Sequence, residues 1–168
     1  MAQPFTRNQR IDPYKNFRFL LFFEGRPDPV AGVSKISPLK RTTEVVSHRD
    51  GGDLSTPRHA PGASKFEPIT FERGVTHDPD FEEWANLVYS TDGDAAVSLA
   101  GYKRNLLIKV NNLQGTPVKA FRVFRAWVSE YTATAELDAN ANAVLIESIV
   151  AQNEGIDRDP DVVEPVET

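Results

Sequence analysis

The chain has 168 residues and no cysteine, which excludes disulfide frameworks, thiolate zinc sites and a cysteine nucleophile. Its length suffices for one domain with a substantial core, and ten phenylalanines, two tryptophans and four tyrosines against one methionine favour a β-rich core. The net charge of −5 resides in residues 154–168, so the rest of the chain is neutral and lacks the basic footprint of a dedicated nucleic-acid binder.

The N-terminal segment, residues 1–13, is polar and is predicted to be an arm outside the domain. It has no apolar stretch of the kind that forms a signal peptide. The sequence also has no apolar run near the ~20 residues that span a bilayer. We therefore expect the protein to be cytoplasmic during assembly, without membrane insertion of the subunit.

Three strands are predicted in the first half of the chain, at Phe17–Glu24, Thr42–His48 and Phe66–Arg73. The first has apolar side chains on both faces, so we expect it to be covered on both sides. The segment Arg49–Ser64 separates the other two strands and contains two prolines and three glycines, which predict a long loop.

One helix is predicted after the sequence Asp78-Pro79-Asp80, because an acidic residue followed by proline is typical of a helix start. Phe81, Trp84 and Val88 recur at helical spacing as far as Tyr89 and predict the face that packs on the sheet. Glu82, Glu83 and Asn86 then point outward.

Further strands are predicted at Leu106–Val110, Val118–Trp127 and Ala143–Gln152. The first two flank the turn-rich segment Asn112–Pro117, which indicates a hairpin with a longer connection. Strands outnumber helices and do not alternate with them. The sequence therefore predicts a mainly β (α+β) fold of two packed antiparallel sheets, as a sandwich or partly open barrel, with one flanking helix.

The three histidines, His48, His59 and His77, lie in or beside predicted loops. His48 with Asp50, or His77 with its neighbour, would supply a general base and an orienting carboxylate, but such short-range pairs in loops are usually solvated or capping groups. Gly51-Gly52 lacks the remaining residues and the following helix of a phosphate loop. We predict no catalytic residue, no cofactor and no metal site.

The acidic segment at the C-terminal end, residues 156–168, contains Pro160 and Pro165 and is predicted to be a flexible, solvated tail. A basic partner is the alternative reading of this segment. Core packing explains the aromatic strand at Phe17–Phe23 better than nucleic-acid stacking, because only Arg18 is interleaved with its rings. A two-sided apolar strand and a long loop are features of a subunit that completes itself against neighbours.

Several blocks of the sequence, in order, carry a family resemblance. They are Phe19–Gly25, Ala31–Leu39, His48–Asp53, Thr56–Gly62, Ile69–Thr76, Ala126–Val128, Leu137–Ala139, Val144–Glu147 and Glu154–Gly155. Over residues 14–155 the chain resembles the phage tail-tube family of contractile phages and extracellular contractile injection systems, a fold relative of the haemolysin-coregulated tube protein of type VI secretion. His48–Asp53 is the most specific block.

The resemblance implies a tail-tube domain at residues 14–155 and a non-enzymatic structural subunit. Hexameric rings of such subunits stack into a hollow tube, and their inner sheets join into one lumenal barrel. The implied partners are further copies of the chain, a sheath protein, baseplate or spike and tube-terminator proteins, and DNA or protein cargo in the lumen. Sheath contraction drives such a tube through a target envelope, as part of a phage tail or a released injection particle.

On this resemblance we expect the long loop to contact a neighbouring subunit or ring, because mixed charges favour register and specificity. The expected contact residues are Arg49, Asp50, Gly51, Gly52, Asp53, Thr56, Pro57 and Arg58. The residues expected to face the sheath are Glu82, Glu83 and Asn86. Two alternatives stay open: a tube adaptor near the baseplate or terminator, and a free β-sandwich binding module.

Overall fold

The computed structural model describes residues 15–16, 18–52, 55–93 and 97–163. The predicted N-terminal arm, residues 1–13, lies outside the described residues. The elements in chain order are β1 (Phe19–Phe23), β2 (Val33–Ile36), β3 (Arg41–His48), β4 (Arg58–Phe66), β5 (Ile69–Gly74), α1 (Asp80–Ala85), β6 (Arg104–Asn111), β7 (Pro117–Thr132), β8 (Ile146–Gln152) and β9 (Gly155–Arg158).

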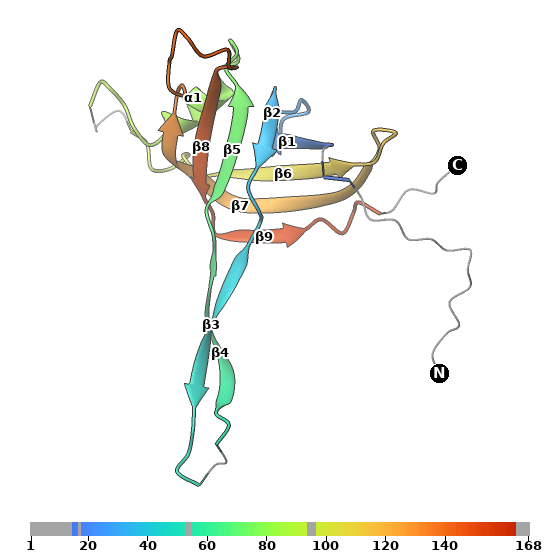
Figure 1. The fold of residues 1–168 in the computed structure, drawn as a ribbon, viewed down its shortest axis with the longest axis vertical. Helices are drawn as coiled ribbons and strands as arrows, with labels where there is room; N and C mark the ends of the chain where they lie inside the picture. The colour runs from blue at the N-terminus through green and yellow to red at the C-terminus, as the bar shows by residue number, and fades with distance from the viewer. Residues whose placement is uncertain (1–14, 17, 53–54, 94–96, 164–168) are drawn as a thin grey trace.

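Two antiparallel sheets share the long strand β7 and form a sandwich. The first sheet has the order β1-β6-β7-β9, and the second has the order β7-β8-β5-β2. In Figure 1, β6, β7 and β9 run across the molecule, whereas β8, β5 and β2 stand upright. The predicted class, mainly β with two antiparallel sheets and one helix, is confirmed. The described strands form a sandwich and do not close into a barrel.

The long strand β7 serves both sheets because it bends at Arg125. The φ angle of Arg125 is 52°, in the left-handed region that side chains other than glycine's adopt at a cost of about 1–2 kcal/mol. The backbone N–H of Arg125 donates to Asn105 Oδ1 at 2.8 Å, so this donor stays satisfied at the bend. Up to Ala126, β7 pairs with β6 and β9, and from Trp127 it pairs with β8.

The core lies between the sheets and is closed by α1. Leu21 and Phe23 point inward from β1, and Phe81 and Trp84 point inward from α1, as the sequence predicts. The Phe23 and Trp84 rings meet edge to face, with centroids 5.3 Å apart. The other face of β1 is not covered as expected, since Leu20 remains exposed. The described residues therefore bury only one face of β1.

A buried ion pair joins β5 to β8 beneath the helix. Arg73 is fully buried and donates through Nε to Glu147 Oε1, which lies opposite it in the ladder. Arg73 Nη2 also donates to the Asp78 carbonyl oxygen at 2.5 Å, and its guanidinium lies 4.3 Å from the Phe81 ring centroid. Burial and the Glu147 carboxylate together raise the pKa of Tyr131, which donates to Glu147 Oε2. This network fixes the start of α1 against the second sheet.

The predicted loop Arg49–Ser64 is wrong over its second half, where β4 lies. β4 pairs with β3 from Arg41↔Phe66 to His48↔Arg58. Pro61 and Gly62 suggested a loop, but both strands of a two-stranded hairpin are edge strands. An edge strand tolerates proline, because the missing N–H can face away from the ladder.

The helix and the C-terminal segment also differ from the prediction. α1 ends at Ala85, although the apolar spacing predicts a helix as far as Tyr89. The flexible tail predicted from residue 156 is wrong at its start, because Gly155–Arg158 forms β9 against β7. Asp159 is buried and pairs with Arg122 at 3.1 Å. Pairing with a distant strand orders a segment whose composition alone indicates disorder.

We expect Arg73→Ala to lower the free energy of unfolding by about 3–5 kcal/mol, because it leaves the Glu147 carboxylate buried without its cation. Lys35→Ala is the matched control. The exposed Lys35 pairs with the half-buried Glu72 at 3.3 Å at the surface, and its loss should cost about 1 kcal/mol or less. Urea unfolding followed by circular dichroism measures both values, and equal losses would contradict the role given to Arg73.

Candidate assembly interface

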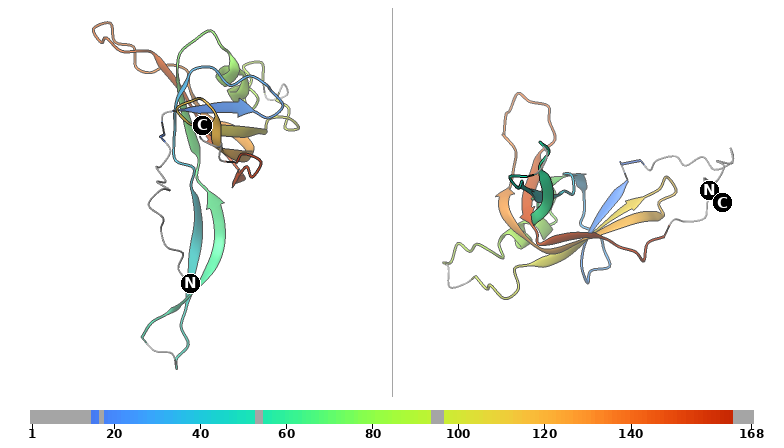
Figure 2. Two further views of the ribbon diagram at one scale, coloured as in Figure 1. Left: turned by 90° about the vertical axis from the view of Figure 1, so that its right-hand side faces the viewer. Right: turned by 90° about the horizontal axis from the view of Figure 1, so that it is seen from below.

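The most prominent surface feature is the projecting hairpin, formed by β3, β4 and their connection. Its strands pair only with each other among the described residues. Figures 1 and 2 show the hairpin leaving the body along the long axis of the molecule. Val45 and Val46 on β3 are 67% and 52% exposed, although both are apolar. The hairpin therefore presents apolar and polar side chains that the described part of the chain does not cover.

Side-chain hydrogen bonds between the strands, and close packing at Gly62, hold the projecting hairpin together where a body element would have a core. Thr43 Oγ1 lies 2.6 Å from Ser64 Oγ, and Ser47 Oγ lies 3.0 Å from His59 Nδ1. A methyl group at Gly62 would meet the Val46 and Glu44 side chains at 3.1 and 3.2 Å. An isolated two-stranded hairpin is marginally stable in water. The projecting hairpin would therefore gain most from a surface outside the chain.

The structure brings the predicted contact residues together at the outer end of this hairpin. Arg49–Gly52 follow β3, Thr56 and Pro57 precede β4, and Arg58 is the first residue of β4. All of these residues are exposed. Asp53 lies outside the described residues. Whether this cluster contacts another subunit stays a prediction.

The second predicted group lies on α1, in the body of the molecule. Glu82, Glu83 and Asn86 are exposed, whereas Phe81 and Trp84 face the core. Asp80 at the helix start pairs with Arg26 at 2.5 Å. Figure 1 places α1 at the opposite end of the molecule from the tip of the projecting hairpin. The two predicted groups therefore form separate surfaces.

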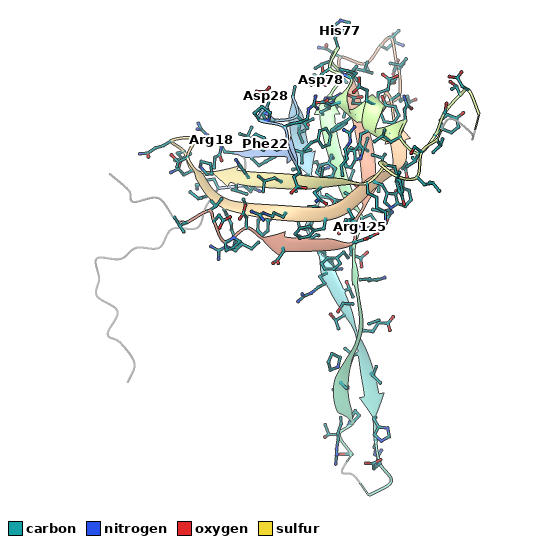
Figure 3. The ribbon with its side chains drawn as sticks, turned by 180° about the vertical axis from the view of Figure 1, so that it is seen from behind. Arg18, Phe22, Asp28, His77, Asp78 and Arg125 are labelled. Atoms are coloured by element: carbon teal, nitrogen blue, oxygen red, sulfur yellow. The ribbon has the colours of Figure 1, made fainter. Side chains whose placement is uncertain are left out.

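A third surface is formed by the edges of the sheets, which the sequence analysis expected neighbours to complete without saying which strands lie there. Among the described residues, β1 pairs only with β6, β9 only with β7, and β2 only with β5. Phe22, labelled in Figure 3, lies on the face of β1 away from the core, and Lys109 Nζ lies 4.6 Å from its ring centroid. The apolar residues on both faces of this strand were the available signal.

Both histidines that the sequence analysis considered with a carboxylate are exposed. His48 Nε2 is 2.8 Å from Asp50 Oδ1 at the end of the projecting hairpin, with both side chains exposed. His77 and Asp78 lie together in Figure 3, and the Asp78 carboxylate is 3.6 Å from Arg73 Nη1. Over residues 15–16, 18–52, 55–93 and 97–163, no group of three or more acidic, histidine or cysteine side chains could hold a metal ion. In the same residues, no helix has the length and apolar character needed to cross a membrane.

Comparisons with known proteins agree with this architecture. The model of the family described as T4-like virus tail tube protein gp19 matches residues 15–157. A chain of the anti-feeding prophage tube terminating cap has a TM-score of 0.77 and 21% identity, covering 95% of this chain and 99% of that chain. A chain of the anti-feeding prophage baseplate has a TM-score of 0.72 and 23% identity, and the match covers 89% of this chain and 97% of that chain.

A chain of the PVC sheath-tube complex, from an extracellular contractile injection system in the extended state, has the same fold. Its TM-score is 0.71 at 20% identity, over 88% of this chain and 91% of that chain. Among curated protein sequences, none matches this chain. The structural likenesses concern the fold, and the family match rests on the sequence.

We expect Gly62→Val to break the pairing of β3 with β4 while leaving the body folded. The new side chain would collide with Val46 and Glu44, whereas Gly51→Val is a matched control because no atom of the described residues lies within 4 Å of the added Cβ there. The thermal midpoint should change little in either variant, and hydrogen exchange of β3 and β4 amides should rise at least about tenfold in Gly62→Val alone. Unchanged protection in Gly62→Val would contradict this account of the hairpin.

Proposed function

This chain belongs to the T4-like virus tail tube protein gp19 family, and we propose from that membership that it is a subunit of the inner tube of a contractile phage tail or extracellular contractile injection system. The family resemblance inferred from the sequence is thereby confirmed, and with it a structural role related to the tail tube. The finer proposal is that hexameric rings stack into a hollow conduit. Sheath contraction then drives this conduit, with DNA or protein cargo, through the target envelope.

The uncovered strands at the two ends of the first sheet carry this proposal. β1 and β9 lie at opposite ends of the order β1-β6-β7-β9 and contain 5 and 4 residues. The outward Leu21 and Phe23 carbonyl groups of β1 already accept from Val30 N and Arg26 N, so a further strand would pair at the Phe19 end of β1 or displace the segment after it. If β9 of one copy pairs with β1 of the next, the same head-to-tail contact repeats by rotation. Such a contact closes a ring and joins the first sheets into one barrel.

The projecting hairpin supplies the second kind of contact. In the proposed tube, Arg49–Gly52, Asp53 and Thr56–Arg58 reach a neighbouring subunit or the adjacent ring. Their mixed charges set the register between copies more than the overall affinity. The exposed Val45 and Val46 side chains support this role, because an apolar surface on a two-stranded element needs cover.

The exposed side of α1 is proposed to face the sheath. Glu82, Glu83 and Asn86 lie on the body, apart from the hairpin tip and from the edges β1 and β9. Partners at the ends of the tube, the baseplate or spike and the terminator, would contact the surfaces that a terminal ring leaves open.

A tube adaptor is the second candidate, because the structural neighbours include a chain of the tube terminating cap as well as one of a sheath-tube complex. Electron microscopy of the purified chain separates the two roles. A tube subunit forms stacked rings of variable length, whereas an adaptor stops at a single ring. A chain that stays monomeric at high concentration would contradict both roles and favour a free binding module.

We expect Arg49→Ala combined with Asp53→Ala to give a soluble, folded subunit whose assembled fraction falls at least about tenfold, because charged contacts that fix the register are lost. Negative-stain microscopy and sedimentation measure assembly. Lys35→Ala combined with Asp92→Ala removes one charge of each sign away from the hairpin and serves as the control. Normal tubes from the hairpin variant would contradict its proposed role.

We expect Glu82→Lys combined with Asn86→Lys to leave ring and tube formation unchanged but to reduce binding of the sheath protein at least about tenfold, since charge reversal at a contact is repulsive. Co-sedimentation of preformed tubes with the sheath protein of the same system measures this. Glu130→Lys, an exposed change on β7, is the control. Normal sheath binding by the α1 variant would place the sheath contact elsewhere.

A further inference from the structure

A polar pocket of about 730 Å³ opens beside α1, between the turn after β1 and the start of β6. Its polar lining carries four cations and two carboxylates. Leu99, Tyr102 and Phe23 add an apolar side, and Leu99 is 78% exposed. The charged lining residues are Arg26, Lys103, Arg104, Arg125, Glu24 and Glu83.

Most of the cations of this pocket already have a carboxylate partner in the chain. Arg26 pairs with Asp80 at 2.5 Å, and both Lys103 and Arg125 pair with Glu154. Arg104 differs, because none of the described residues forms an ion pair with it. The half-buried Arg104 guanidinium lies 4.9 Å from the Phe23 ring centroid. Burial, with Arg26 nearby, lowers the pKa of Arg104, and the Asp80 and Glu83 carboxylates only partly oppose this effect. The pocket thus contains a positive charge that an incoming carboxylate would stabilise.

A complementary feature lies elsewhere on the same chain, in the β7–β8 loop (residues 133–145). Leu137 and Val144 of this loop are 76% and 78% exposed. Glu136 and Asp138 flank Leu137, are exposed, and have no ion-pair partner in the described part of the chain. The loop therefore combines two carboxylates with apolar side chains at one exposed place.

The β7–β8 loop has a defined shape. Ala135 N donates to the Ile146 carbonyl oxygen at 2.9 Å and closes the base of the loop. Asn140 N donates to Asp138 Oδ1 at 2.9 Å, and Ala141 N donates to the Asp138 carbonyl oxygen at 3.1 Å. These two hydrogen bonds form a turn. Figure 1 shows the loop extending beyond the upper ends of β8 and β5. A preorganised loop loses less conformational entropy on docking than a flexible one.

We propose that the β7–β8 loop of one copy docks into the Arg104 pocket of a second copy. This inference rests on the proposed tube assembly, and it names a contact additional to the sheet edges and the projecting hairpin. An Asp138 or Glu136 carboxylate meets Arg104, and Leu137 packs on Leu99 and Tyr102. Because the loop and the pocket are different surfaces of one chain, the contact is head-to-tail and can repeat from copy to copy.

Charge exchange tests the docking. Arg104→Glu alone, or Glu136→Arg with Asp138→Arg alone, should raise the concentration needed for assembly at least about tenfold, because like charges would then face each other. Combining all three changes in one chain should restore assembly, since the attraction is re-formed with opposite signs. Arg104→Lys and Asp138→Glu keep the charges and are the matched controls. Thermal unfolding of every variant checks that the subunit is folded.

Disulfide trapping tests the same contact directly, because the chain has no cysteine of its own. Leu99→Cys combined with Leu137→Cys should form a ladder of covalent oligomers on oxidation of assembled protein, visible on a non-reducing gel. Each single variant can form dimers at most. The variant Leu113→Cys with Leu137→Cys is the control, since Leu113 is equally an exposed leucine but lies outside the pocket.

The outcomes separate this inference from the proposed function. Loss of assembly in the charge variants, its restoration on exchange and a disulfide ladder support the docking. If the wild-type protein and the charge variants all assemble normally and no disulfide ladder forms, the docking is overturned. The tube proposal is unaffected by that result. Wild-type protein that stays monomeric under all conditions would overturn both. If Arg104→Glu loses assembly and the chain with all three changes does not regain it, Arg104 serves another partner. That result would overturn the docking with a second copy.

Discussion

The bend in β7 at Arg125 is the constraint from which the rest of the architecture follows. A straight strand of this length would extend one sheet and leave the inner faces of β1 and β5 without a facing layer. The left-handed backbone at Arg125 instead directs the second half of β7 into the other sheet, at a cost of about 1–2 kcal/mol. Asn105 accepts the released N–H, and the layers close over Phe23, Phe71 and Trp84. Sandwich, core and helix position all depend on that one turn of the chain.

The same construction leaves parts of the molecule incomplete. The two sheets share a central strand, so their other ends, β1, β9 and β2, lack a second neighbour among the described residues. Within the described part of the chain, the projecting hairpin has no apolar layer beneath it and is held by backbone hydrogen bonds between its strands and by side-chain hydrogen bonds. The body, in contrast, has a continuous core and the buried Arg73–Glu147 pair. The interactions that stabilise the fold lie in the body, whereas the exposed apolar side chains and unpaired strand edges lie at the sheet edges and the projecting hairpin. This distribution is expected of a subunit.

Local patterns predicted the elements that contain their own alternation or apolar periodicity, namely β1, β3, β5, the β6–β7 hairpin, β8 and the buried face of α1. They failed where pairing partners are distant. β9 is acidic and short, and is a strand because β7 lies beside it. β2, with only Val33 and Ile36 partly buried, has too little alternation to be seen. Pro61 and Gly62 suggested a loop because sequence does not reveal that β4 is an edge strand. The hairpin tip was found through family resemblance, whereas the free edges and the Arg104 pocket require the fold.

In the proposed tube, the surfaces differ in the kind of load that they can carry. Strand pairing between β1 and β9 would form a continuous hydrogen-bonded ladder around the ring, and a ladder resists separation because its bonds must break together. The projecting hairpin and the β7–β8 loop present side chains, so contacts through them depend on charge and shape and can be released or re-formed one at a time. A tube that is pushed as one body needs rings that do not open. It also needs joints between copies that form in the correct register during growth, and the division of this chain into ladder edges and charged projections meets both requirements.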